Sequence, residues 1–303
     1  MHLLITGAWG SAKEHIPELE ALGHEIVFMQ QERDALLCDP AWVEGVIGNG
    51  LFLHHPIESF PNLRYIQLTS AGFDRVPMDY VKVHGIEIHN ARGVYSIPMA
   101  EFAVAGILQL YKQSRFFYEN QKAHRWEKRR DLMELSGKTV LILGCGSVGT
   151  ECAKRFRAFG CKVLGLNRTV REDLAFDEIR PLDELDSALP KADVLILTLG
   201  LSKDTRHLMN AERLALLKPG AVLVNIARGA LNDTEALTAV LPKLTGAVLD
   251  VFEEEPLPDT SPLWDCENVI LTPHNSFVGE GNGARLAGVI AEYLMQVQGK
   301  ATM

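Results

Sequence analysis

One glycine-rich run, GCGSVG at residues 144–149, restricts the fold more than any other segment. It follows the apolar run TVLILG directly and opens the helical pattern ECAKRFRAFG, so it occupies a strand–turn–helix junction. The first glycine permits a tight turn, the second lets an anion approach the backbone, and the third lets helix and strand pack closely. The helix N-terminus attracts a pyrophosphate. We predict that Gly144, Gly146 and Gly149 bind a dinucleotide, the alternative being an ordinary glycine turn.

The residues about 20 positions further on indicate which dinucleotide is bound. An Asp or Glu usually receives the ribose 2′-hydroxyl of NAD there, but this chain has Asn167, Arg168 and Thr169. Without a carboxylate nothing repels a 2′-phosphate, and Arg168 offers a charged, planar donor. We predict that these three residues bind NADP(H) in preference to NAD(H), which stays possible. The alternative for Arg168 is a surface arginine without a cofactor role. The glycine-rich turn taken alone is also compatible with an enzyme that binds S-adenosylmethionine.

Two series of short apolar runs predict an α/β protein with two doubly wound parallel sheets. The first is HLLITG, EIVFM, RYIQLTS and GIEIHN; the second, after a long helical stretch from Ile97 to about Glu119, is TVLILG, CKVLGLN, VLILTL, AVLVNIA, AVLD and NVILTP. AERLALLKPG and DTEALTAVL are expected to be helices, the second capped by Asp233. A last amphipathic helix, Ala284 to Val297, is expected to return to the first lobe.

Length and charge limit the organisation and the partners. A chain of 303 residues favours two domains, which we place at 1–96 plus 283–303 and at 97–282. The excess of 39 acidic over 30 basic residues argues against nucleic acid, and no apolar run approaches a membrane span. The five cysteines show no zinc spacing, so no metal is expected. Reduced thiols and the absence of a secretory signal pattern suggest a cytoplasmic protein.

Beyond the glycine turn, several ordered motifs resemble the D-isomer-specific 2-hydroxyacid dehydrogenase family over nearly the whole chain. They are TSAGFDRVPMD, NARGVYSIPMAEF, LSKDTRHLMN, LLKPGAVLVNIARGALND, AVLDVFEEEPLP and NVILTPHNS. The resemblance implies a Rossmann NAD(P)-binding domain and a flavodoxin-like substrate domain. It also implies transfer of a hydride between the nicotinamide ring and C2 of a 2-keto or 2-hydroxy acid.

The resemblance assigns a catalytic set. His274 would move the proton, which suits an imidazole near neutral pH. Glu255, the acidic residue just before proline, would orient it, and Arg228 would bind the substrate carboxylate. Weaker assignments follow the same pattern: substrate binding by Ser70, Ala71 and Gly72, and cofactor binding by Ser147, Val148, Ile226, Ala227, Asp250, Asn275 and Ser276.

These observations favour a reductase of small 2-ketoacids such as glyoxylate or hydroxypyruvate. An NAD-linked D-2-hydroxyacid or phosphoglycerate-type dehydrogenase is the alternative enzyme, and a dinucleotide-sensing, corepressor-like binding protein is the alternative of another class. The run NSFV after His274 departs from the small residues common in the family. Because the helix beginning at Ile97 is apolar over much of its surface, we expect a homodimer.

Overall fold

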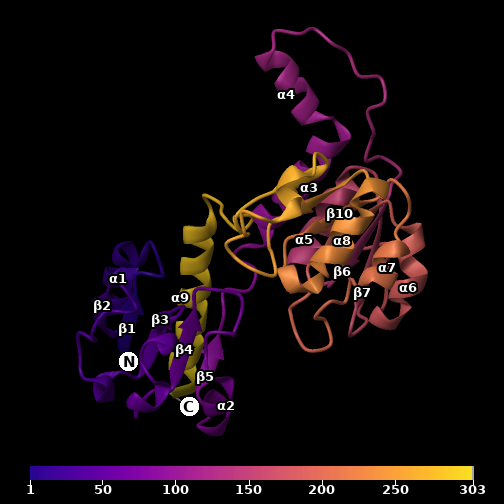
Figure 1. The fold of residues 1–303 in the computed structure, drawn as a ribbon. Coiled ribbons are helices and arrows are strands. Elements are labelled where there is room, and N and C mark those ends of the chain that lie inside the picture. Colours follow the sequence, from indigo (N-terminus) through magenta and orange to yellow (C-terminus); the bar gives the residue numbers. More distant parts are fainter. Residues whose placement is uncertain (302–303) are drawn as a thin grey trace. The chain divides into compact units, whose positions relative to one another are not determined.

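The chain forms two compact units, each with its own parallel sheet (Figure 1). The computed structural model describes the backbone of residues 1–301 and the side chains of residues 1–295. One unit is formed by Met1–Tyr95 together with the chain from Gly279 onward, and the other by Ser96–Val278. The two sheets confirm the α/β class with two parallel-sheet lobes.

In the first unit, five parallel strands lie in the order β2-β1-β3-β4-β5. The strands are β1 (His2–Thr6), β2 (Glu25–Met29), β3 (Gly45–Gly48), β4 (Tyr65–Leu68) and β5 (Glu87–His89). The helices are α1 (Ala12–Ala21), α2 (Met78–Val83) and α9 (Asn282–Ala301).

Alternate side chains of these strands fill two separate cores. Leu3 and Ile5 of β1 pack on one face of the sheet with Leu19 of α1 and with Leu286 and Ile290 of α9. The other face is covered by α2 and by the loop segments after β3. The last helix is therefore part of the same core as the first strand.

In the second unit, seven parallel strands lie in the order β12-β11-β10-β9-β6-β7-β8. The strands are β6 (Thr139–Leu143), β7 (Lys162–Asn167), β8 (Glu178–Pro181), β9 (Val194–Leu197), β10 (Val222–Asn225), β11 (Gly246–Leu249) and β12 (Val269–Leu271). The helices are α3 (Ser96–Tyr111), α4 (Ser114–Lys122), α5 (Ser147–Ala158), α6 (Leu185–Ala188), α7 (Ala211–Ala215) and α8 (Thr234–Val240).

Both faces of this sheet are buried, as the continuous apolar strands predict. Val140 and Ile142 of β6 face α3 and α5, whereas Leu141 and Leu143 face the layer of α6, α7 and α8. Asp233 accepts a hydrogen bond from the Ala236 amide and caps α8, which confirms the predicted start of that helix. The segments at the carboxyl ends of β6, β7, β10, β11 and β12 carry the predicted site residues of this unit.

The helix predicted from Ile97 to about Glu119 is wrong as one element. It divides into α3 and α4 at Gln113, which has a left-handed backbone (φ 53°). The apolar side of α3 packs against its own sheet and α5, so it needs no second chain to cover it. Figure 1 shows α4 and the following segment projecting from the sheet of their unit, and Trp126 on that segment is 95% exposed.

Two strands were not expected: β3, a short run between glycines, and β8, a partly exposed edge strand. None of the helices in the described part of the chain is both long enough and apolar enough to span a membrane.

Candidate active site

The glycine-rich turn has the shape that binding of a pyrophosphate requires. Gly144 has a φ of 101°, and a Cβ on Gly149 would lie 2.0 Å from the Gly144 carbonyl oxygen, so neither position accepts a side chain. Gly146 is the N-cap of α5 and provides no side-chain cap, and the space where its Cβ would point is open. The first amides of a 12-residue helix thus face an open cradle. These residues fit the pyrophosphate of a dinucleotide, with Ser147 and Val148 in the first turn of the helix.

Residues after β7 lie beside this turn. The Asn167 Oδ1 accepts from the Cys145 amide at 3.4 Å, and its Nδ2 donates to the Thr169 carbonyl at 2.8 Å. Arg168 is exposed and makes no hydrogen bond or ion pair with the rest of the described chain. Arg171, which the sequence analysis did not select, donates from Nη2 to the Cys145 carbonyl at 2.7 Å. Arg171 therefore places a guanidinium against the glycine turn, and Arg168 is exposed at the end of β7, where position 167 is Asn in place of the carboxylate that favours NAD.

At the carboxyl end of β10, backbone contacts hold the segment that contains Arg228. Asn225 donates from Nδ2 to the Arg228 carbonyl at 3.0 Å, and its Oδ1 accepts from the Ala227 amide at 3.1 Å. Ile226 and Ala227 are buried, whereas Arg228 is partly exposed. A Cβ on Gly229 would lie 1.9 Å from the carbonyl carbon of Phe252, so this segment touches the loop that follows β11.

That loop brings Glu255 to His274. The Glu255 Oε2 lies 2.8 Å from the His274 Nδ1, and its Oε1 accepts from the Phe252 amide at 3.0 Å. An ionised carboxylate only accepts, so Nδ1 is the donor and Nε2 is left for proton exchange. The sequence placed these residues 19 positions apart, and the structure brings their side chains together.

Asp250 has contacts that the sequence did not predict. The residue is completely buried, and its carboxylate accepts from the Thr272 hydroxyl at 2.6 Å and from the amides of Asn275 and Ser276 at 2.7 and 2.9 Å. Its carbonyl accepts from the His274 amide at 2.8 Å. Asp250 therefore holds the turn in which His274 has its left-handed backbone (φ 50°).

In the other unit, the predicted substrate-binding residues follow β4. The carbonyl oxygens of Ser70, Ala71 and Gly72 accept hydrogen bonds from the Ala91 amide, the Asn90 side chain and the Ser70 hydroxyl. The amides of Ala71 and Gly72 donate to no other group in the described part of the chain. This loop therefore presents backbone donors, which suit a carboxylate.

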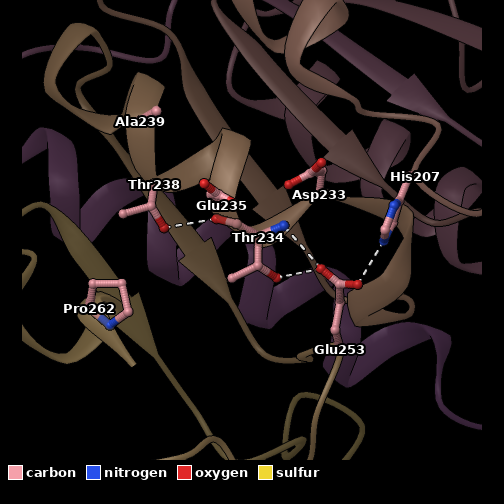
Figure 2. A pocket seen from close by; sticks show the side chains of 8 residues that line it. All are labelled: His207, Asp233, Thr234, Glu235, Thr238, Ala239, Glu253 and Pro262. Atoms are coloured by element: carbon pink, nitrogen blue, oxygen red, sulfur yellow. Dashed lines mark hydrogen bonds and ion pairs between the residues drawn. The ribbon is translucent and has the colours of Figure 1, made fainter. Parts of the chain in front are cut away.

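A second histidine–glutamate pair involves the loop after β11, the loop that also carries Glu255. His207 Nε2 is 2.7 Å from Glu253 Oε2, and Glu253 Oε1 accepts from the hydroxyl and the amide of Thr234 (Figure 2). These residues border a cavity of about 750 Å³ that does not include Arg228, Glu255 or His274. Within the described residues no group of His, Cys, Asp and Glu could hold a metal ion.

The parallel sheet carries a glycine cradle at the end of β6 and, at the ends of the neighbouring strands β10, β11 and β12, an arginine and a histidine–carboxylate pair, a combination typical of a dinucleotide-dependent oxidoreductase. Residues 104–276 match the model of the D-isomer specific 2-hydroxyacid dehydrogenase, NAD binding domain. The chain is 33% identical over 296 residues to a glyoxylate reductase of Thermofilum pendens, covering 94% of this chain and 83% of that protein. The chain belongs to the D-isomer specific 2-hydroxyacid dehydrogenase family, whose members are NAD(P)-dependent enzymes.

Two solved structures share its architecture. A D-isomer specific 2-hydroxyacid dehydrogenase from Xanthobacter autotrophicus Py2, in complex with NADPH and MES, is 27% identical, with a TM-score of 0.80 and coverage of 98% of this chain and 95% of that one. A D-lactate dehydrogenase from Aquifex aeolicus, complexed with NAD and lactic acid, is 26% identical, with a TM-score of 0.81 and coverage of 99% and 96%. The family thus includes proteins solved with either cofactor.

Proposed function

We propose that this enzyme is an NADP(H)-preferring reductase of small 2-ketoacids such as glyoxylate or hydroxypyruvate. The observation that carries the catalytic assignment is the 2.8 Å contact between His274 Nδ1 and Glu255 Oε2, which leaves Nε2 free to exchange a proton. When bound at the glycine turn, the cofactor would supply a hydride for C2 of the substrate. His274 then donates its Nε2 proton to the oxygen on C2, and Glu255 stabilises the imidazolium before that transfer.

Arg228 and the loop after β4 are proposed to bind the substrate carboxylate. A guanidinium can hold a carboxylate with two hydrogen bonds and polarise the neighbouring keto oxygen. The free amides of Ala71 and Gly72, with Ser70, supply further donors from the first unit. We accordingly assign substrate binding to the unit that contains β1–β5 and cofactor binding to the unit that contains β6–β12.

The proposed preference for NADP(H) rests on Arg168 and Arg171. Both follow β7, the strand that pairs with β6 of the glycine turn. Position 167, where an NAD-binding domain usually has an acidic residue, is Asn. A ribose 2′-phosphate would accept charge-assisted hydrogen bonds from them and from Thr169. At the other end of the cofactor we place Ile226 and Ala227, with Asn275 and Ser276 on the turn held by Asp250.

Initial velocities test this proposal directly. NADPH and NADH are each compared against glyoxylate, hydroxypyruvate, pyruvate and a bulkier 2-ketoacid. We expect a higher kcat/KM with NADPH than with NADH, and with the small ketoacids than with the bulkier one. A higher kcat/KM with NADH would refute the Arg168 assignment and favour the NAD-linked dehydrogenase, while no turnover with any ketoacid would favour the binding protein.

The proposed homodimer forms through α4 and the segment after it, in place of α3. Trp126 is 95% exposed, and Phe117, Tyr118 and Leu132 on the same projection are also exposed. Large exposed apolar side chains that gather on one projecting segment are typical of a protein interface. We expect light scattering to give a dimer that Trp126→Ser weakens, and a wild-type monomer at micromolar concentration would contradict the proposal.

A further inference from the structure

Two glutamates of one loop each pair with a histidine whose backbone is left-handed. Glu255 pairs with His274 (φ 50°), and Glu253 pairs with His207 (φ 48°) at 2.7 Å. A non-glycine residue rarely adopts this backbone conformation, so surrounding contacts must hold it there. The first pair belongs to the proposed function, whereas the second has no part in it.

We propose that His207 and Glu253 are positioning residues, which hold the Phe252–Glu253 peptide so that Glu255 meets His274. The proposal rests on the proposed role of His274 as the proton donor. It adds a requirement that lies outside the groups that touch substrate or cofactor.

Both oxygens of the Glu253 carboxylate are fixed. Oε1 accepts from the Thr234 amide at 3.0 Å and from the Thr234 hydroxyl at 2.7 Å, and Oε2 accepts from the His207 Nε2 (Figure 2). Burial alone would raise the pKa of this carboxyl, but the hydrogen bonds from Thr234 and His207 outweigh it and hold the pKa below its usual value. Glu253 is therefore an ionised anchor near neutral pH.

We call the pair of His207 and Glu253 the clamp. Its other end, His207, is attached to the segment that contains Arg228. The His207 amide donates to the Ala230 carbonyl at 2.7 Å, two residues after Arg228. A Cβ on Gly229 would lie 1.9 Å from the carbonyl carbon of Phe252 and 2.4 Å from the amide nitrogen of Glu253. One peptide, Phe252–Glu253, is thus the common support for Arg228 and for the loop of Glu255.

Glu253 can transmit its position to the catalytic pair through one hydrogen bond. The amide of Phe252, the residue before it, donates to the Glu255 Oε1, while the Glu255 Oε2 faces His274. On the opposite side, Glu253 borders the cavity of about 750 Å³, so little packing supports the loop there. Hydrogen bonds to Glu253 must then keep the Phe252 amide in place.

The test removes each clamp residue and follows both kinetics and the His274 imidazole. His207→Gly deletes the ring and also relieves the left-handed backbone, and Glu253→Ala deletes the carboxylate. Glu253→Gln is the conservative variant, because its carboxamide still accepts from Thr234. Glu178→Gln is the matched control, since it breaks an exposed 2.7 Å ion pair with Arg180 in the same unit.

We expect His207→Gly and Glu253→Ala to lower kcat roughly tenfold to a hundredfold, with KM and NADPH affinity within about twofold, because misplacement affects the reacting geometry. The His274 Nδ1–H signal in NMR, identified by its loss in His274→Gln, should shift in both variants. Glu253→Gln should recover most of the rate, and Glu178→Gln should match the wild type.

The decisive comparison is made in the Glu255→Gln background. If the clamp acts through Glu255, His207→Gly should lower kcat less than about threefold there, because coupled residues are not additive. An equal fall in both backgrounds, or an unchanged Nδ1–H signal, would overturn the proposal. If His207→Gly does not fold, the comparison of Glu253→Ala with Glu253→Gln decides. A wild type inactive on every ketoacid would refute the proposed function, while the NMR signal would still test the clamp.

Discussion

Replacing Gly229 by alanine should impair both catalysis and stability. The new Cβ would lie 1.9 Å from the Phe252 carbonyl carbon, 2.1 Å from its oxygen and 2.4 Å from the Glu253 nitrogen. Ordinary contacts of this kind begin near 3.4 Å, so the Phe252–Glu253 peptide must move by about 1 Å or more. Such a shift carries the Phe252 amide, and with it the Glu255 carboxylate, away from His274.

Two magnitudes follow from this displacement. A misplacement of about 1 Å lowers turnover by roughly a hundredfold, whereas an overpacked site destabilises by about 1–3 kcal/mol. For a unit of this size that cost lowers the midpoint of thermal unfolding by roughly 2–12 °C.

The assay measures kcat with saturating NADPH and 2-ketoacid, together with thermal unfolding. Gly288→Ala is the control, because its Cβ meets nothing within 4 Å and an alanine inside α9 should stabilise slightly. A Gly229→Ala enzyme with wild-type kcat would refute the assigned contact between the Arg228 segment and the Glu255 loop.

Three further predictions concern the cofactor edge, acid stability and the thiols. Arg168→Ala and Arg171→Ala should each raise the KM for NADPH roughly tenfold, as loss of a charge-assisted hydrogen bond implies, and leave the KM for NADH nearly unchanged in steady-state kinetics; equal effects on both cofactors would contradict the 2′-phosphate assignment. Burial alone would raise the pKa of Asp193, but hydrogen bonds from Lys218 and the Thr139 amide hold it below its ordinary value of 3.8. The stability that the Asp193 carboxylate contributes is therefore complete above that value and is lost as the pH falls through the lower pKa of the folded state. Thermal unfolding should show Asp193→Asn destabilised at pH 7. The difference in unfolding temperature from the wild type should close in acid. Burial raises the pKa of the Cys145 and Cys152 thiols to about 12. Mass spectrometry after treatment of the native enzyme with a thiol reagent at pH 8 should therefore find these two cysteines unlabelled. The first cysteines to be labelled should be Cys38 or Cys266, which are partly exposed.

The sequence predicted those parts of the fold in which local pattern and tertiary position agree. The apolar runs of the second sheet, the glycine turn and the Asp233 cap lie where the pattern indicated. β3 escaped notice because a four-residue strand bounded by Gly45 and Gly48 resembles a turn. The break at Gln113 was missed because no glycine or proline marks it.

The motifs indicated the proposed catalytic pair, Glu255 and His274, but not the residues that support it. The motif selects Glu255, the glutamate next to proline, as the partner of His274, but only the structure shows that Glu253 faces His207, 46 residues away. Arg171 lies four residues beyond Asn167, and no pattern indicates that its side chain folds back onto the glycine turn. The buried Asp250 likewise reaches its partners only through the neighbouring strands β11 and β12.

The most direct test of the proposed function compares wild type with His274→Ala, measuring NADPH oxidation by glyoxylate and hydroxypyruvate together with NADPH binding by fluorescence. The proton-donor role predicts that the variant binds NADPH as the wild type does and loses turnover by roughly a hundredfold to ten-thousandfold. Wild-type turnover in His274→Ala would contradict it.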